Sequence, residues 1–203
     1  MDYIMDYWNI RINNWKNNLI LSAPHWYKHF RNNEIRWREL KTTEIVETIS
    51  NDLDVFSIYK TCDDDKDANW DKKCEYKSLL KWTIQNNNIK FLFDIHWMNS
   101  NWNQDICIGI NSWQNIHWRE DILEKIIQIF KEEWFANIGI DIPFKASYEN
   151  CISRYIAKEC NIPTFQIEIN LKYRSDQFDE YKKYNNLINS LKKIINYILT
   201  HEK

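Results

Sequence analysis

The chain has 203 residues, of which 44% are hydrophobic and 28% are charged, a balance typical of a folded protein with a substantial core. The 27 basic and 29 acidic residues give a net charge of −2, so the basic surplus that binds nucleic acid or anionic membranes is lacking. Tryptophan is abundant, with 11 residues. Buried aromatic packing is the commoner reason for such a content, and a sugar-binding surface is the alternative.

The sequence carries no feature of a targeting or membrane segment. The first 15 residues contain acids where a signal peptide has basic residues, and they have no apolar core. No stretch reaches the length of a transmembrane helix. Scattered cysteines without a CxxC pair indicate reduced thiols. We therefore expect a single domain over residues 1–203, located in the cytoplasm, with no membrane or nucleic-acid partner and an oligomeric state that stays open.

Strand and helix patterns alternate along the chain. In chain order, the expected elements are a strand over 11–24, a polar loop, a helix over 42–53, a strand over 55–59, an acidic loop over 62–71, a helix around 74–85, strands over 89–99 and 104–110, helices over 118–135 and 148–160, a strand over 162–171 and a long helix through 184–198. Strands that alternate with helices favour an α/β domain with a mostly parallel or mixed sheet.

The strand IKFLFDIHWMN, residues 89–99, carries two ionisable residues in an otherwise apolar run. Because side chains alternate along a strand, Asp94 and His96 point to the same face, near the end of the strand. A histidine satisfied within the core is the commoner explanation for a lone residue of this kind. The alternative is a metal or catalytic site, since a buried ionisable group needs a partner.

Three further residues lie at or near the ends of predicted elements. His25 follows an apolar strand and a proline, and ligand sites of α/β proteins gather at such strand ends. Glu39 precedes a helix among basic residues, where a solvated surface acid is the simpler explanation. Glu168 lies on the polar face of the strand IPTFQIEINL, and that face is expected to line a cavity or to meet solvent, with neither favoured.

Together these residues supply the components of an open zinc site. Two histidines and a carboxylate hold zinc and leave room for water, and an unligated glutamate can accept a proton from that water. His25, His96 and Glu39 are the candidate ligands, Glu168 is the candidate base, and Asp94 is a candidate to orient His96. The acidic loop over 62–71 is not a calcium loop of the EF-hand type, because the required glycine and the final glutamate are missing.

The order of motifs resembles the N-formylglutamate amidohydrolase family. The matching segments, over roughly residues 19–174, are SAPH, an arginine with RWRE, DANW, FDIHWM, DICIGI, IPFKASYENCISRYIA and FQIEIN. The resemblance implies a three-layer α/β/α fold of the phosphorylase/hydrolase-like type, related to the zinc carboxypeptidases. It also implies one zinc ion per chain, held by His25, Glu39 and His96, with Glu168 as the general base.

The resemblance further implies residues that grip a substrate carboxylate or carbonyl. These are Arg154, Asn69 and Arg31, since a guanidinium can bind a carboxylate through two hydrogen bonds. The sequence departs from the family at three indoles, Trp26, Trp70 and Trp97, which stand where small residues or an arginine are usual. We expect these indoles to narrow, alter or close the pocket.

The sequence thus predicts a zinc-dependent amidohydrolase that acts on a small N-acyl amino acid, including an N-formyl one, or on a peptide-like amide. One alternative is a peptide or cell-wall carboxypeptidase or amidase with the same metal site. Another is a non-catalytic binding protein on a retired enzyme scaffold, with the tryptophans as its recognition surface.

Overall fold

The structure is a computed structural model that describes residues 3–174 and 181–202. Its main feature is an eight-stranded mixed sheet with the order β1-β2-β6-β3-β7-β10-β8-β9. The four central strands β6, β3, β7 and β10 run parallel, and the pairs β1–β2, β2–β6 and β10–β8 are antiparallel. The strands of this sheet are β1 (Tyr3–Tyr7), β2 (Ile10–Asn14), β3 (Asn17–Ala23), β6 (Val55–Lys60), β7 (Phe91–Met98), β8 (Ile106–Gly109), β9 (Ile138–Ile140) and β10 (Thr164–Asn170).

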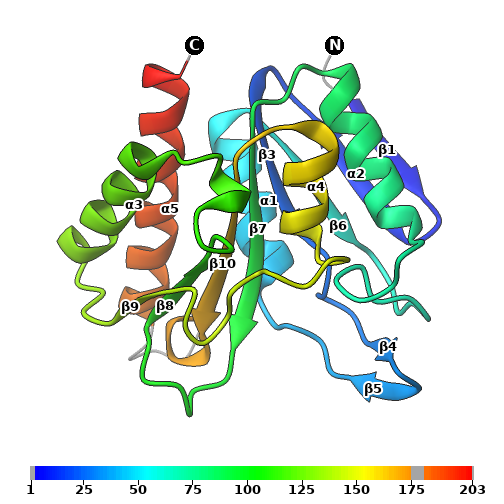
Figure 1. Ribbon diagram of the computed structural model, residues 1–203, viewed down its shortest axis with the longest axis horizontal. Helices are drawn as coiled ribbons and strands as arrows, with labels where there is room; N and C mark the ends of the chain where they lie inside the picture. The colour runs from blue at the N-terminus through cyan, green and yellow to red at the C-terminus, as the bar shows by residue number, and fades with distance from the viewer. Residues whose placement is uncertain (1–2, 175–180, 203) are drawn as a thin grey trace.

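Helices cover both faces of the sheet (Figure 1). One face packs against α1 (Thr42–Leu53), α3 (Glu120–Glu132) and α5 (Tyr181–His201), and the other packs against α2 (Glu75–Asn86) and α4 (Ile152–Cys160). Two short 3-10 helices, η1 (Gln114–Ile116) and η2 (Leu171–Tyr173), follow β8 and β10. The predicted three-layer α/β/α fold with a mixed sheet is confirmed. Within the described residues, no helix is long and apolar enough to cross a lipid bilayer.

The prediction of one strand over 11–24 is wrong. This segment forms two strands, β2 and β3, which are separated in the sheet by β6. Ile10 and Ile12 of β2 alternate with less buried or polar residues, as an outer strand requires, whereas the continuous apolar run of β3 is buried on both faces. The change of periodicity marks the break at Trp15 and Lys16.

Four short strands were not predicted from the sequence. β1 and β9 lie at the two edges of the sheet. β4 (His29–Arg31) and β5 (Glu34–Arg36) form a separate two-stranded hairpin where a polar loop was expected. Strands of three to five residues carry too few positions for a period of two to stand out.

The central parallel strands end at one edge of the sheet, and the polar side chains of interest lie there. In Figure 1 the arrowheads of β7 and β10 point to the same end of the molecule, where the β4–β5 hairpin projects. In the register of these two strands, His96 lies opposite Glu168 and Asp94 lies opposite Gln166. Paired residues point to the same face of a sheet, so this pairing brings the histidine and the glutamate together.

Candidate active site and metal centre

Two histidines and one glutamate meet at this edge of the sheet. His25 follows β3, His96 lies near the end of β7, and Glu39 lies in the segment that leads into α1. The Nδ1 atom of His25 is 3.0 Å from Glu39 Oε1, and the Nδ1 atom of His96 is 3.2 Å from Glu39 Oε2. The ligand atoms of the three residues all lie within 4.8 Å of one another. Two imidazole nitrogens and a carboxylate oxygen are a donor set that suits a zinc ion.

Each of the two histidines contacts a further carboxylate through its other ring nitrogen, Nε2. Asp67 Oδ1 is 2.9 Å from His25 Nε2, and Asp94 Oδ2 is 2.9 Å from His96 Nε2. Both aspartates are fully buried. A carboxylate at Nε2 holds the proton on that nitrogen, orients the ring and leaves the Nδ1 lone pair for a cation. The arrangement therefore fits a divalent cation between His25, His96 and Glu39, and Asp94 contacts His96 as the sequence led us to expect.

The charges of this cluster shift the pKa values of its members, and the shifts report a negative potential around the two histidines. Burial by itself would lower the pKa of His25, but the carboxylates of Glu39 and Asp67 outweigh it and raise that pKa. The pKa of His96 is raised in the same way by Asp94 and Glu39. Burial would raise the pKa of Glu39, and the two histidines outweigh it, so that the pKa is lowered. The cluster thus stabilises positive charge in its centre.

Asp94→Asn is expected to weaken zinc binding about 10- to 100-fold, because losing the carboxylate behind a ligating histidine has an effect of this size. A chelator competition titration on the purified variant would measure it. Asp65→Asn is the matched control, since Asp65 is exposed and forms no ion pair or hydrogen bond with any described residue. A zinc affinity equal to that of the wild type would remove Asp94 from the metal site.

His29 and Arg31 of the β4–β5 hairpin also contact Asp67. The His29 ring stacks on that of His25 with centroids 4.2 Å apart, and its Nε2 lies 3.5 Å from Asp67 Oδ2. His25, His29 and Asp67 form a second group that could hold a cation. However, Arg31 Nε donates to Asp67 Oδ2 at 2.6 Å, and its positive charge disfavours a cation there. The first group is therefore the better candidate for a metal centre.

The metal cluster opens into a pocket of about 460 Å3, and Glu168 is part of its lining. Glu168 is 6% exposed, and its Oε1 accepts a hydrogen bond of 2.8 Å from Gln166 Nε2. Burial raises the pKa of Glu168 to about 8, with the charge of Glu39 adding to the effect. The polar face of β10 thus lines a cavity and does not meet bulk solvent, which resolves the alternative left open by the sequence.

The three predicted substrate-binding residues lie in different places. Asn69 and Arg31 line the pocket, and Asn69 Nδ2 is 3.1 Å from His96 Nε2. Arg154 of α4 is not part of the pocket lining; it donates a hydrogen bond to the carbonyl of Ser147 and lines a separate hollow. Ser147 does line the pocket, so Arg154 contacts the loop that forms one wall of it.

The three unusual indoles also differ in their contacts. Trp70 lines the pocket and stacks on Tyr148 with centroids 4.5 Å apart. Trp97 lines the pocket as well, and the guanidinium carbon of Arg174 lies 4.6 Å from its ring centre. Trp26 is not part of the lining, and its ring meets Tyr27 edge to face. Two of the three indoles therefore narrow the pocket, and the pocket stays open.

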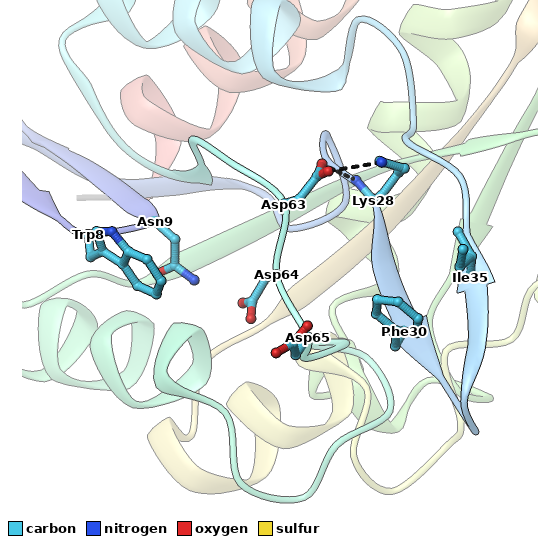
Figure 2. A pocket seen from close by; sticks show the side chains of 8 residues that line it. All are labelled: Trp8, Asn9, Lys28, Phe30, Ile35, Asp63, Asp64 and Asp65. Carbon is cyan, nitrogen blue, oxygen red and sulfur yellow. Dashed lines mark hydrogen bonds and ion pairs between the residues drawn. The ribbon is translucent and has the colours of Figure 1, made fainter.

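A smaller pocket of about 260 Å3 lies beside the acidic loop and the hairpin (Figure 2). Its acidic wall contains Asp63, Asp64 and Asp65. Lys28 forms an ion pair with Asp63 at 3.1 Å, and Lys60 forms one with Asp64 at 2.8 Å. Because lysines already neutralise two of the three aspartates, this wall does not have the charge of a calcium site, in agreement with the failed loop pattern.

Sequence reasoning missed Asp67 and Arg174. Asp67 was noticed only as part of the acidic loop, although it directly precedes the Ala-Asn-Trp sequence that carries Asn69. Arg174 follows η2, and no pattern marks it. The contact of His29 with Asp67 depends on the β4–β5 hairpin, which the sequence did not predict.

The arrangement of the sheet and its helices is similar to that of several solved structures. N-formylglutamate amidohydrolase from Ralstonia eutropha JMP134 superposes with a TM-score of 0.65 over 94% of this chain and 98% of that one, at 11% identity. A metallo-carboxypeptidase from Burkholderia cenocepacia superposes with a TM-score of 0.58 over 93% of this chain and 61% of that one, at 10% identity. An N-acetylmuramoyl-L-alanine amidase from Clostridium difficile 630 gives a TM-score of 0.53 over 93% and 100%, at 13% identity.

No family model and no curated protein matches this sequence. The structural comparison therefore establishes the fold, and it confirms the resemblance to the N-formylglutamate amidohydrolase and zinc-carboxypeptidase fold at the level of architecture. The similar structures are those of hydrolases that, by their names, act on amides and peptides.

Proposed function

We propose that this protein is a zinc-dependent amidohydrolase that cleaves a small N-acyl amino acid or a peptide-like amide. The observation that carries the proposal is the meeting of His25, Glu39 and His96 with a buried Glu168 in one pocket. Hydrolysis of an amide needs an electrophile to polarise the carbonyl and a base to activate water, and this pocket contains candidates for both.

His25, Glu39 and His96 would hold the metal ion, and Asp67 and Asp94 would orient the two histidines. A bound zinc ion supplies Lewis acidity, which polarises a substrate carbonyl and lowers the pKa of water to about 7. A bound cation would favour the ionised form of Glu168. In that form Glu168 would take the proton of the attacking water and deliver it to the leaving amine. Gln166 supports this role, because its hydrogen bond to Glu168 Oε1 fixes the carboxyl group.

Arg31 and Asn69 would hold the substrate beside the metal. In the described part of the chain, the two terminal guanidinium nitrogens of Arg31 have no hydrogen-bond partner, since Asp67 binds only Nε. They can therefore form a bidentate pair with a carboxylate that enters the pocket. Asn69 lies beside His96, where a side-chain amide can donate to a polarised carbonyl.

Arg31→Met is expected to lower kcat/KM about 10- to 100-fold for an N-acyl amino acid, as a charge-assisted hydrogen bond of about 1.5–3 kcal/mol predicts. The corresponding N-acyl amino acid amide, which has no carboxylate, should lose far less. Measuring both substrates in one variant separates loss of the carboxylate contact from indirect disturbance of Asp67. An equal loss for both substrates would contradict a carboxylate-binding role.

The direct test of the proposed function is a substrate panel with zinc-loaded protein. Amine release would be measured from N-formyl, N-acetyl and N-succinyl amino acids and from short peptides. Faster cleavage of the acyl amino acids supports the proposal, and faster cleavage of the peptides supports the carboxypeptidase alternative. Hydrolysis of neither class, in protein shown to hold zinc, would contradict the proposed activity.

A further inference from the structure

A buried arginine lies directly behind the candidate active site. Arg174 follows η2 and is 2% exposed, which is rare for an arginine. Its Nε donates a hydrogen bond of 3.2 Å to the carbonyl of Ile169, and its Nη1 donates to the carbonyl of Leu40. Its guanidinium carbon lies 4.6 Å from the centre of the Trp97 ring, within the range of a cation–π interaction.

Each of these three contacts involves the residue that directly follows a site residue. Leu40 follows the metal-ligand candidate Glu39, and Ile169 follows the general-base candidate Glu168. Trp97 follows the metal-ligand candidate His96 in the same way. One guanidinium thus contacts three separate segments of the chain, each at the residue that follows a candidate metal ligand or the candidate base. The Leu40 carbonyl belongs to the peptide unit between Leu40 and Lys41, so this bond holds the chain directly after Glu39.

Glu39 is the site residue most in need of such support. His96 and Glu168 are held by paired strands, whereas Glu39 lies outside regular structure, between β5 and α1. Its own N–H donates to the carbonyl of His25 at 2.8 Å, and its carbonyl accepts from Thr42 Oγ1 at 2.9 Å. The bond from Arg174 to the next carbonyl completes the restraint and ties this segment to the end of β10.

The positive charge of Arg174 is compatible with its buried position near two carboxylates. Burial lowers its pKa to about 10, and the carboxylates of Glu39 and Glu168 oppose that decrease. The side chain therefore stays positive at neutral pH, close enough to both carboxylates to interact with them. Its charge is delocalised, and Nε and Nη1 reach fixed carbonyls, whereas the buried Nη2 has no hydrogen-bond partner among the described residues.

We infer that Arg174 is a positioning residue that aligns Glu39, His96 and Glu168 for metal binding and catalysis, and that Trp97 serves as its stacking partner. The inference rests on the proposed metal site. It also gives the indole at position 97 a contact, since the Trp97 ring stacks on the guanidinium. A metal site needs ligands held within about 0.5 Å of their productive positions, and a ligand on a loop achieves this only with outside support.

The test is a zinc competition titration with a chelator, which does not depend on activity. Arg174→Met removes the charge and both donors, whereas Arg174→Lys keeps the charge and one donor site. Arg119→Met is the matched control, since Arg119 pairs with Asp121 and Glu202 and contacts no site residue. Arg174→Met is expected to weaken zinc binding about 10- to 100-fold, with part of the affinity restored in Arg174→Lys and none lost in the control.

A purely structural role predicts a different result. In that case Arg174→Met would melt at a lower temperature and yet bind zinc as tightly as the wild type, which would overturn the inference. Zinc affinities of the Met and Lys variants that fall equally would overturn it too, because the charge and the donor would then be irrelevant. The visible spectrum of cobalt-substituted protein gives a second readout, since a displaced Glu39 would alter the cobalt bands.

If Arg174→Met does not fold, the zinc affinities of Arg174→Lys and Trp97→Leu test the inference. Trp97→Leu removes only the stacking contact, so a smaller loss of zinc affinity is expected than in Arg174→Lys. Wild-type affinity in both variants would overturn the inference. The failure of this inference can be told apart from the failure of the proposed activity. If the wild type binds zinc through His96 and hydrolyses no amide, the proposed activity is contradicted. The zinc titration of the Arg174 variants remains valid in that case.

Discussion

Glu168→Gln is expected to keep its zinc and to lose about 10²- to 10⁴-fold in kcat, the usual contribution of a positioned general base. Glutamine has almost the same shape as glutamate, so the pocket and the hydrogen bond with Gln166 can persist with little change in packing. The amide cannot accept the proton of an attacking water, and the loss should therefore fall on kcat and not on substrate binding. The measurement pairs steady-state kinetics with elemental analysis of the same preparation.

The control for this variant is Glu159→Gln on the solvent side of α4. Glu159 forms an ion pair with Lys81 at the surface, and its loss should leave kcat unchanged. Turnover in Glu168→Gln equal to that of the wild type would remove Glu168 from the mechanism. Loss of zinc together with loss of turnover would instead assign Glu168 to metal binding, which the separate metal analysis would detect.

His96→Ala is expected to abolish stoichiometric zinc binding. The variant removes one of the three candidate ligands. Its loss of zinc affinity should exceed the 10- to 100-fold loss that follows when a residue hydrogen-bonded to a ligand is removed. Elemental analysis of protein purified without added zinc should find near one zinc per chain in the wild type and little in the variant. The physical reason is that Glu39 and His25 alone leave the cation with too few donors.

His201→Ala is the control for this experiment, because His201 is an exposed residue at the end of α5, remote from the site. Retention of one zinc per chain in His96→Ala would place the metal elsewhere, for example in the second group of His25, His29 and Asp67. A wild type that takes up no zinc even when zinc is added would leave His96 as a buried histidine. That result would favour the binding-protein alternative.

The sequence by itself determined the fold class and the inward placement of two site residues. Strand and helix periods alternate clearly from residue 42 onward, and the apolar strand around Asp94 and His96 could be assigned to the interior. His96 and Glu168 were placed at or near the ends of predicted strands, and their convergence was a hypothesis. The register of β7 and β10 brings the two residues together. These inferences succeed because they depend on local periodicity and on a general rule of topology.

The sequence did not determine which loops reach the site. Asp67 contacts His25 across 42 positions of the chain, and Arg174 contacts Leu40 across 134. The role of Arg154 was taken from a resemblance, and in the structure its guanidinium lies on the carbonyl of Ser147, outside the pocket. Contacts of this kind arise when loops from distant segments pack on one edge of the sheet, and no local pattern encodes them.

The outer strands and the three indoles also show what the sequence determined and what only the tertiary structure decided. Residues 11–24 were expected to form one strand, and the insertion of β6 between β2 and β3 shows that they form parts of two. Trp70 and Trp97 line the pocket while Trp26 does not, although all three follow short polar motifs. The direction of a side chain in a loop depends on backbone dihedrals set by tertiary contacts, whereas its direction in a strand follows from the sequence alone. The sequence therefore determined the alternation of strands and helices and the interior strand that carries His96. The tertiary structure decided the cavity at Glu168, the place of Glu39 beside the histidines, the partners of the histidines and the walls of the pocket.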